Sequence, residues 1–423
     1  MKVVVIGGGA AGMMAAIEAA KNNHKVLLFE RNEKLGKKIY ITGKGRCNCT
    51  NSAPIEEFFS NFISNPRFLY SAFHSFTNEN LMSFLEERGT HLKVERGNRV
   101  FPVSDHASDV TRAFERELKK NHVQVYLNTG VKKVLTLGDD YLPIDGEKYT
   151  DRVSGVLLDD GTIEECDAVI VCTGGYSYQT TGSTGDGYRF AKDLGLKVTD
   201  IRPSLVPLTT KDTDIFELQG LSLKNVTLRI PYGKKKKYEE QGEMMFTHFG
   251  ITGPLCLRAS AIVGKSLEES KELQAEIDLK PALSVDQLDQ RILRDFTKEI
   301  NKNIHTILCG LLPAKMIPIV LNRVGIPGDK KAHDITKKER LALVFILKHF
   351  TITINGTEGF QQAIVTQGGV SVKEVSPNTM EVKTIKNLYF AGEVLDIDGF
   401  TGGFNLQAAF STGFLAGQSV MDH

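Results

Sequence analysis

Residues 2–30 read KVVVIGGGAAGMMAAIEAAKNNHKVLLFE, and this stretch decides the fold. The apolar run at 2–6 is typical of a strand that is buried on both faces of a parallel sheet. Three glycines follow it, an alanine-rich segment from Ala10 to about Lys21 predicts a helix, and residues 25–30 predict a second strand. Strand, glycine turn, helix and strand in succession form a complete βαβ unit.

The turn inside this unit has the spacing Gly-x-Gly-x-x-Gly. Gly7 permits a tight turn, Gly9 lets the backbone approach a pyrophosphate, and Gly12 lets the helix pack closely on the strand. The N-terminus of the helix then presents its unpaired N–H groups to the phosphates. Glu30 ends the second strand, where a carboxylate can accept hydrogen bonds from ribose hydroxyls. The unit therefore predicts a dinucleotide site formed by Gly7, Gly9, Ala10, Ala11, Gly12 and Glu30.

Residues 384–393, TIKNLYFAGE, indicate which dinucleotide binds. They resemble the second FAD fingerprint of the glutathione-reductase-like flavoproteins, in which a strand delivers a carboxylate to the ribityl chain beside the pyrophosphate. Gly392 and Glu393 are the predicted contacts, and Glu393 stands where this superfamily usually has Asp. Asp396 and Asp398 lie nearby, so the sequence leaves open which carboxylate meets the ribitol. The predicted cofactor is FAD.

Two further segments are shared with such flavoproteins. Residues 399–409, GFTGGFNLQAA, place glycines before a helix that should start near Asn405 and point its N-terminus at the ligand. In related flavoproteins the N1–C2=O edge of the isoalloxazine lies there, and the helix dipole stabilises the anionic reduced flavin. A strand at 167–172 and the turn after it should pack against the first βαβ unit. The contacts predicted from both segments are Thr173, Gly174, Gly175, Gly403, Asn405, Leu406 and Gln407.

A fourth segment, ITGKGRCNCTN at 41–51, follows the second strand. Gly43 and Gly45 permit close approach of the backbone, while Lys44 and Arg46 supply donors for phosphate or flavin carbonyls. A purely structural turn is the alternative. The contacts predicted in and around this loop are Lys37, Thr42, Gly43, Arg46, Cys47 and Asn48, with Val131 at the start of a group of short antiparallel strands over 131–165.

Length and pattern predict the domain organisation. A chain of 423 residues is too long for one comfortable core. Alternating β-type segments run from about 196 to 275, helical periodicity covers 284–348, and strands are expected again at 351–354 and 362–385. We expect a nucleotide-binding domain of 1–195 and 384–423, an inserted β-rich domain of 196–280 and 350–383, and a small helical domain of 281–349.

Several motifs extend the resemblance over nearly the whole chain. They are GKGRCNCTN at 43–51, RVFP at 99–102, SLVPL at 204–208, FTHFGITGP at 246–254 and GFTGGFNLQ at 399–407. Together they resemble the bacterial BaiN/YhiN-like NAD(P)/FAD-dependent oxidoreductases. The resemblance implies an α/β fold with a Rossmann-type FAD-binding domain, an inserted β-rich domain and a small helical domain. One branch of the family reduces a steroid double bond in bile acids; family members often carry an aromatic residue after the Gln407 position, where this chain has Ala408.

The predicted function is therefore that of an FAD-dependent oxidoreductase, which takes hydride from NADH or NADPH and passes it to a small unsaturated or carbonyl compound. No second Gly-x-Gly-x-x-Gly occurs, so the nicotinamide donor is expected to dock transiently over the flavin. The candidates for substrate chemistry are His248 as a proton source, Cys47 beside the reactive flavin edge, and Arg99 as a partner for an anionic substrate. A structural histidine, a small buried cysteine and a surface ion pair are the respective alternatives.

Charge and composition restrict the possible partners, location and metal content of the protein. A net charge of +1 provides no global field for nucleic acid, so a small-molecule substrate is expected and a nucleic-acid partner is not. Lys234–Lys237 predicts a solvated hairpin tip, with a partner contact as the alternative. The chain has no apolar stretch of roughly 18 residues and no signal-peptide pattern, which favours a cytoplasmic protein without a membrane span. The six cysteines lack metal-ligand spacing, so no metal is predicted, and the oligomeric state stays unknown.

Two other functions remain open. The first is a flavin-dependent RNA-modifying enzyme, because flavoproteins that modify tRNA share these FAD segments. The second is a non-catalytic flavin redox sensor that signals by moving its inserted domain.

Overall fold

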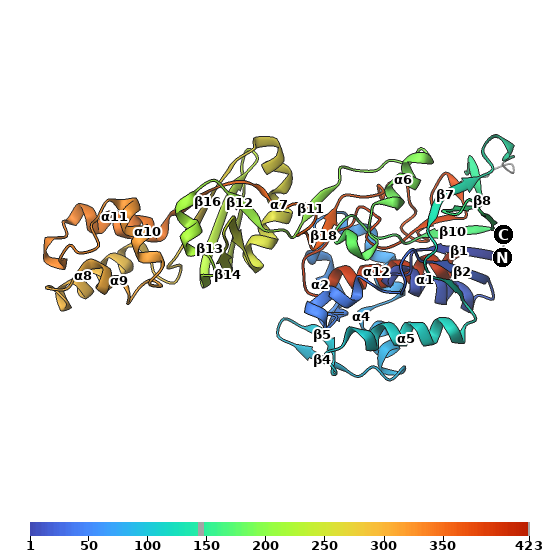
Figure 1. Cartoon of the computed structure of the whole chain (residues 1–423), viewed down its shortest axis with the longest axis horizontal. Helices are drawn as coiled ribbons and strands as arrows, with labels where there is room; N and C mark the ends of the chain where they lie inside the picture. Colours follow the sequence, from blue (N-terminus) through green and yellow to red (C-terminus); the bar gives the residue numbers. More distant parts are fainter. Residues whose placement is uncertain (143–147, 422–423) are drawn as a thin grey trace. The chain divides into compact units, whose positions relative to one another are not determined.

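The computed structural model describes residues 1–142 and 148–421 and divides the chain into two compact units (Figure 1). Unit 1 consists of Met1–Arg202 and Ile364–His423, and unit 2 of Pro203–Ala363. The second unit is thus inserted between two parts of the first. Each unit is described by itself.

Unit 1 is built on a parallel five-stranded sheet in the order β20-β10-β1-β2-β6. The register places Val4 opposite both Val169 and Leu27. The apolar runs form these strands because each side chain is covered on one face or the other, and β1 and β10 are buried almost throughout. This sheet confirms the predicted Rossmann-type fold. The strands are β1 (Lys2–Ile6), β2 (Lys25–Phe29), β6 (Gln124–Tyr126), β10 (Ala168–Val171) and β20 (Leu388–Phe390).

Helices and two small sheets complete unit 1. The antiparallel strands expected over 131–165 are present as β7, β8 and β9, and β19 joins β8 in parallel. The strands are β3 (Thr50–Asn51), β4 (Leu92–Glu95), β5 (Arg99–Pro102), β7 (Val131–Thr136), β8 (Asp151–Leu158), β9 (Ile163–Glu165) and β19 (Ile385–Lys386). The helices are α1 (Ala10–Lys21), α2 (Ile55–Phe58), α3 (Tyr70–Ser75), α4 (Asn78–Glu86), α5 (Ala107–Lys120), α6 (Asp186–Asp193) and α12 (Phe404–Ser419).

The first and last helices of the chain pack backbone to backbone. A Cβ atom at Gly413 would collide with the carbonyl oxygen of Ala11, and one at Gly417 with that of Ala15. Glycine is therefore the residue that lets α12 lie this close to α1. The contact attaches the C-terminal segment to the glycine turn that precedes α1.

Unit 2 is a closed barrel in the order β12-β15-β14-β13-β16-β17, with helices attached. The strands are β12 (Leu208–Thr210), β13 (Ser222–Tyr232), β14 (Lys236–Phe246), β15 (Gly250–Thr252), β16 (Leu273–Asp278) and β17 (Phe350–Thr357). The helices are α7 (Pro254–Ser270), α8 (Val285–Lys298), α9 (Ile304–Leu308), α10 (Met316–Val324) and α11 (Lys337–Lys348). Lys234–Lys237 lies at the tip of the β13–β14 hairpin, as predicted.

The barrel and the helices after it share one buried cluster. Ile292 of α8, Val320 of α10 and Val344 of α11 belong to the same core as Ile277 of β16 and Phe350 of β17. The sequence pattern predicted a β-rich domain and a separate helical domain. In the structure the barrel and these helices belong to one compact unit, because their apolar faces are buried against each other.

The region 362–385 differs from the pattern. It was expected to be strands, yet it contains only β18 (Val365–Gln367), which pairs with β11 (Arg202–Ser204), the start of β19, and isolated bridges. Val370, Val375 and Val382 are fully buried although they lie outside the strands, so apolar residues in this region fill the core without forming a sheet. None of the helices in the described ranges has the length and apolar character needed to cross a membrane.

We expect Gly413→Ala to lower the free energy of unfolding by about 1–3 kcal/mol, because the added methyl group must push α12 away from Ala11. Gly264→Ala in the middle of α7 is the matched control. Its Cβ would meet no atom within 4 Å, so stability should stay equal or rise by about 0.5–1 kcal/mol. Urea unfolding followed by circular dichroism measures both, and equal stability of the two variants would contradict the close-packing argument.

Candidate functional site

The glycine turn between β1 and α1 contains one open position. Gly7 has φ +101°, and a Cβ there would lie 2.6 Å from the Cys172 carbonyl oxygen, while a Cβ at Gly12 would collide with the Gly7 carbonyl oxygen. Both glycines are therefore required by packing. Gly9, the N-cap of α1, is different: a Cβ there meets nothing within 4 Å. The turn leaves free space next to the start of α1.

The first turn of α1 has the properties of an anion-binding helix N-terminus. No side chain caps it, and it contains no acidic residue. The first N–H groups of a helix have no partner within the helix, and they form the positive end of its dipole. Ala10 and Ala11 contribute only methyl side chains at this end of the helix.

Glu30 supports the turn from the second strand. Its Oε2 accepts the Gly8 N–H at 2.7 Å, and its Oε1 accepts the backbone and side-chain N–H groups of Asn32 at 2.8 and 2.7 Å. The residue is only 8% exposed. A carboxylate can accept about four hydrogen bonds. Glu30 therefore fixes the glycine turn and keeps an acceptor position at Oε2.

The segment after β20 brings a second carboxylate into unit 1. Glu393 Oε2 accepts from Lys38 Nζ at 2.5 Å, and Oε1 accepts from the Thr366 N–H at 2.9 Å and from Ser177 Oγ at 3.2 Å. Lys38 also donates to Ser177 Oγ at 2.8 Å. Glu393, one of the three carboxylates considered from sequence, thus forms a partly exposed ion pair with Lys38.

The predicted cofactor contacts include Lys37, whereas the structure places its neighbour Lys38 on Glu393. The ammonium group of Lys37 binds Asn32 Oδ1 at 3.3 Å and Glu33 Oε2 at 3.2 Å, away from the Glu393 cluster. Two adjacent lysines look alike in a sequence, and only the position of the loop shows which one faces the second carboxylate.

The other two carboxylates have different surroundings. Burial raises the pKa of Asp396 above its ordinary value. Asp398 is fully buried, and its Oδ2 accepts from Gln367 Nε2 at 3.3 Å.

Gly392 joins the two ends of the chain at this point. Its N–H donates to Thr412 Oγ1 at 2.9 Å in α12, and a Cβ at Gly392 would lie 2.9 Å from the Ala11 Cβ of α1. The glycine turn, the end of β20 and the two helices therefore meet at one place.

Thr173 Oγ1, in the turn that follows β10, and Asn48 Oδ1 are two of the buried side-chain oxygens in unit 1 that have no hydrogen-bond partner among the described residues. Leaving such a group unpaired costs about 1–3 kcal/mol. Both lie in segments predicted to contact the cofactor, and a polar ligand would satisfy them. Gly174, with φ +72°, and Gly175, whose Cβ would lie 3.1 Å from the Glu393 carboxyl carbon, continue the Thr173 turn.

The loop before β3 has unusual backbone geometry. Gly43, Lys44 and Gly45 have φ values of +57°, +58° and +88°, and Cys47 has +62°. Thr42 closes the preceding turn by donating to the Ile39 carbonyl at 2.7 Å. Left-handed conformations of non-glycine residues are uncommon and tend to gather at functional sites.

Arg46 is occupied by other side chains. Its guanidinium binds Glu95 at 2.8 Å and Asp105 at 3.3 Å, and it lies 4.2 Å from the centre of the Phe101 ring. The hydrogen bond from Arg46 lowers the pKa of Glu95. Arg46 therefore orders the loop, and its side chain is not a free donor in the structure.

Cys47 lies in the core. It is fully buried, and burial raises the pKa of its thiol to about 12. The thiolate is the nucleophilic form of cysteine, so this side chain is not a reactive nucleophile at neutral pH.

The N-terminus of α12 resembles that of α1. Gly403 is the N-cap with φ +96°, a Cβ there would collide with the backbone of Thr50, and no side chain caps the helix. Two predicted contacts in this helix have internal roles. Asn405 bonds the Gly399 N–H at 2.8 Å and the Gly399 carbonyl at 2.7 Å, and Gln407 is fully buried against Thr50 and Phe76. Both side chains are thus occupied, and the Gln407 N–H also bonds the Gly403 carbonyl at 3.1 Å.

The remaining candidates are dispersed. Leu406 is half-buried in α12, and Val131 is buried at the start of β7 opposite Leu158. Arg99 is exposed at the start of β5, where its Nε donates to the Arg96 carbonyl at 3.0 Å. His248 belongs to unit 2, in a tight turn that Thr247 closes by accepting from the Gly250 N–H at 3.0 Å. That turn exposes the imidazole, which packs edge-on against Phe249. The described residues bring together no group of three His, Cys, Asp or Glu side chains that could hold a metal ion.

Curated relatives match the chain along its full length. A 3-dehydro-bile acid delta(4,6)-reductase of Clostridium scindens is 31% identical over 423 residues, which cover 100% of this chain and 99% of the relative. A ribosomal RNA dihydrouridine synthase of Haemophilus influenzae is 34% identical over 420 residues, covering 99% and 98%. One of the same name from Escherichia coli is 30% identical over 419 residues, covering 99% and 97%.

A solved structure of similar fold is the 3-ketosteroid-delta4-(5alpha)-dehydrogenase of Rhodococcus jostii RHA1. It is 14% identical, with a TM-score of 0.51 over 99% of this chain and 96% of that chain. At this identity the similarity shows the fold alone. The family model described as HI0933-like protein Rossmann domain matches residues 1–419, in agreement with the resemblance found in the motifs. The chain belongs to the HI0933-like family.

Proposed function

We propose that the protein is an FAD-dependent reductase that adds hydrogen across a carbon–carbon double bond conjugated to a carbonyl group. The observation that carries this proposal is the open space at Gly9, beside the uncapped start of α1. It belongs to a chain whose full-length relatives are named as a 3-dehydro-bile acid delta(4,6)-reductase and a ribosomal RNA dihydrouridine synthase.

The residues of unit 1 fit FAD. The space at Gly9 and the amides of Ala10 and Ala11 would receive the pyrophosphate, and Glu30 Oε2 would accept from a ribose hydroxyl. The Glu393–Lys38 pair would hold the ribityl chain, and the unpaired Thr173 Oγ1 and Asn48 Oδ1 would gain partners. When bound, FAD supplies two-electron hydride chemistry. The uncapped N-terminus of α12 would stabilise negative charge on the ring system.

The names of the relatives support one reaction class. A delta(4,6)-reductase acting on a 3-dehydro-bile acid reduces double bonds conjugated to a ketone. A dihydrouridine synthase reduces the uracil C5=C6 bond, which is conjugated to the C4 carbonyl. Each such reduction balances as a hydride added to the electrophilic carbon of the conjugated bond and a proton added to its other carbon: β and α for the uracil bond and a Δ4 bond, δ and γ for a Δ6 bond of a dienone. The same change is proposed for this chain, with NADH or NADPH as the donor.

The acceptor belongs to one of two classes. A small enone is the first candidate, in agreement with the near-neutral charge of the whole chain. Uridine in ribosomal RNA is the second, and it is favoured by two full-length relatives of that name at 34% and 30% identity. In either case His248 is the proposed proton donor, and Arg99 the proposed contact for an anionic group of the substrate.

The first experiment is an anaerobic absorbance scan of the purified protein with NADH and then NADPH, followed by addition of an acceptor. We expect flavin absorbance that one nicotinamide bleaches and that either a cyclic enone or a uridine-containing RNA transcript restores. Mass spectrometry of the acceptor should show a gain of two hydrogen atoms. Protein that stays colourless in the presence of added FAD would overturn the proposal.

Gly9→Ala should separate cofactor binding from folding. The Cβ meets no protein atom and φ is −81°, so the variant should unfold like the wild type. The methyl group would occupy space needed by the pyrophosphate, and FAD affinity should fall by about tenfold or more, a cost of ~1.4 kcal/mol or greater. Bound flavin per chain measures this, with Gly264→Ala as the control. Full flavin occupancy in Gly9→Ala would place the pyrophosphate elsewhere.

The catalytic candidates should differ in their kinetics. His248→Asn should slow acceptor reduction by roughly 10²-fold while leaving bleaching by the nicotinamide unchanged, because only the second half-reaction needs the proton. Cys47→Ala should keep the rate within a few-fold, because a thiol with a pKa of about 12 is not ionised at neutral pH. Stopped-flow measurement of each half-reaction checks both. An unaffected second half-reaction in His248→Asn would exclude it as the proton donor.

A further inference from the structure

We propose that the outward face of α8 in unit 2 is a docking surface for RNA, where Arg294 and Lys298 contact backbone phosphates. The inference rests on the second acceptor class proposed above, RNA-borne uridine. It is carried by the charge and geometry of α8 and the helices around it.

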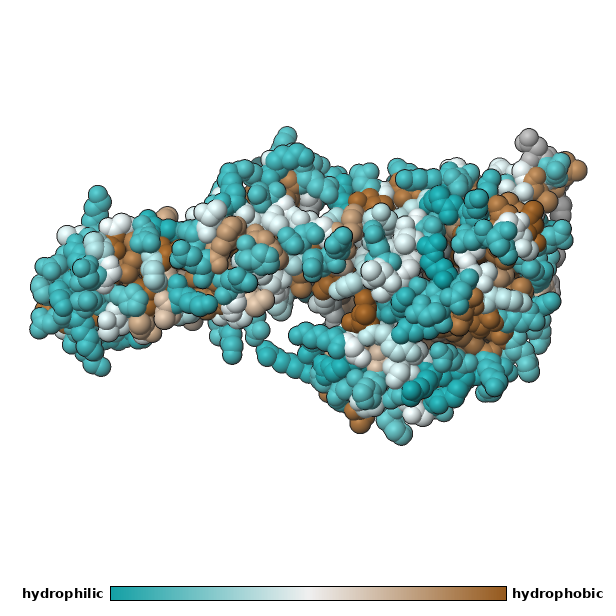
Figure 2. Space-filling model, viewed as in Figure 1, coloured by the Kyte–Doolittle hydropathy of each residue, from teal (hydrophilic) through white to brown (hydrophobic). Residues whose placement is uncertain are grey.

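The charge of the chain is unevenly distributed. Residues 281–349 contain twelve Lys and Arg against seven Asp and Glu, a net charge of +5, whereas the whole chain has +1. The helices α8 to α11 therefore form a basic region in an otherwise slightly acidic protein. In Figure 2 the end of unit 2 that carries these helices shows mainly hydrophilic side chains. A local basic patch attracts a polyanion even when the net charge is near zero.

On α8 two of the three acidic residues are neutralised by ion pairs, the third, Asp286, lies exposed in the first turn, and two cations are unpaired among the described residues. Past the first turn of the helix, Asp289 pairs with Arg340 at 2.7 Å, Asp295 with Arg291 at 2.7 Å, and Glu299, just after its end, with Lys302 at 2.5 Å. Arg294 and Lys298 are exposed, and neither has a hydrogen-bond or ion-pair partner among the residues that the structure describes.

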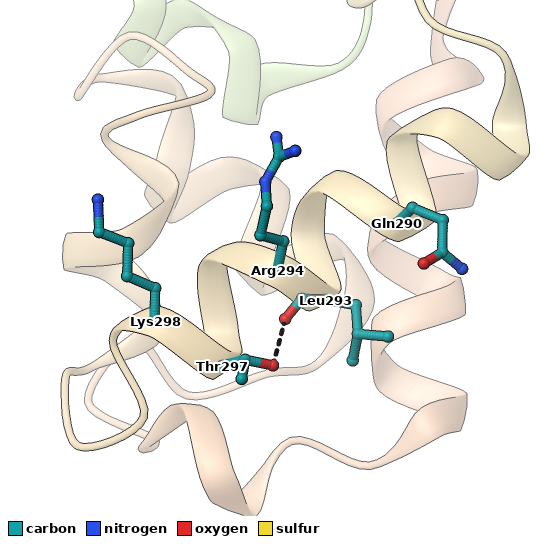
Figure 3. Close-up of a pocket in the computed structure, with 5 residues that line it drawn as sticks. All are labelled: Gln290, Leu293, Arg294, Thr297 and Lys298. Atoms are coloured by element: carbon teal, nitrogen blue, oxygen red, sulfur yellow. Dashed lines mark hydrogen bonds between the residues drawn. The ribbon is translucent and has the colours of Figure 1, made fainter.

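These two cations lie on one face of the helix with other donors. Gln290, Leu293, Arg294, Thr297 and Lys298 line a shallow hollow of about 420 Å³. Figure 3 shows Arg294 and Lys298 extending from α8 one turn apart, with Gln290 one turn further along. Thr297 Oγ1 donates to the Leu293 carbonyl at 2.9 Å, which leaves the hydroxyl oxygen free as an acceptor.

The chemistry of this face matches a nucleic-acid backbone. Arg, Lys, Gln and Thr are side chains that contact phosphate and sugar oxygens, and the arginine fork binds phosphate through two parallel hydrogen bonds. From Gln290 to Lys298 the helix rises by about 12 Å at 1.5 Å per residue, which spans several nucleotides at ~3.4 Å per strand step. A single small anion would use only part of this row. Leu293, 38% exposed, offers an apolar surface to a sugar or base.

The test is binding of a uridine-containing RNA hairpin to the full-length flavoprotein, measured by fluorescence anisotropy over a range of salt concentrations. Arg294→Gln/Lys298→Gln should raise Kd about tenfold and reduce the magnitude of the slope of log K against log salt by about 2. Lys119→Gln/Lys192→Gln removes the same charge from exposed positions of α5 and α6 in unit 1 and should change neither quantity appreciably. Arg294→Lys/Lys298→Arg keeps the charge and should bind nearly as well as the wild type.

The outcomes separate this inference from the proposed function. Absent RNA binding, or equal binding by the wild type and the α8 variant, overturns the docking surface, as does equal weakening by the control pair. Flavin content and bleaching by nicotinamide are measured on the same preparations. A protein that bleaches and reduces enones but binds no RNA overturns only the inference, while one that binds RNA through α8 but holds no flavin overturns only the proposed function.

Discussion

Unit 1 depends on the close contact between the backbones of α1 and α12. Ala11 and Ala15 on one helix face Gly413 and Gly417 on the other, and no larger residue than glycine fits at the two α12 positions. Because of this contact, the end of β20 and the start of α12 lie beside the glycine turn. The contact between α1 and α12 therefore helps to position the cofactor-binding residues proposed after residue 390.

The two carboxylates of unit 1 are held in different ways. Glu30 is fixed by backbone and amide N–H groups, which give it direction without a counter-charge. Glu393 is fixed by an ammonium group and a hydroxyl, so its charge is balanced before any ligand arrives. Hydrogen bonds made in advance reduce the reorganisation that binding requires. Both carboxylates are thus held in place in advance for a ligand that contacts several parts of unit 1.

Sequence patterns predicted the features that steric rules enforce. Gly7 and Gly12 are recognisable because no other residue fits beside the Cys172 and Gly7 carbonyls. The strands β1 and β10 are recognisable because an unbroken apolar run is typical of a strand buried on both faces. Features that depend on the path of the chain were not predictable. Lys38 and Lys37 differ only in where a loop points them, and Gln407 lies inside because Thr50 and Phe76, far away in sequence, offer it partners. Periodicity likewise cannot reveal that α8, α10 and α11 share a core with the barrel.

The position of α12 has a kinetic consequence for synthesis on the ribosome. Helix α1 needs α12, which follows unit 2 in the sequence, to cover it. Unit 2 has its own buried cluster and its whole sequence between these parts, so it can fold while unit 1 still waits. During that interval the apolar surface of α1 has no final partner, and a chain that ends prematurely never acquires one. The insertion thus allows unit 2 to fold before the second part of unit 1 has been made.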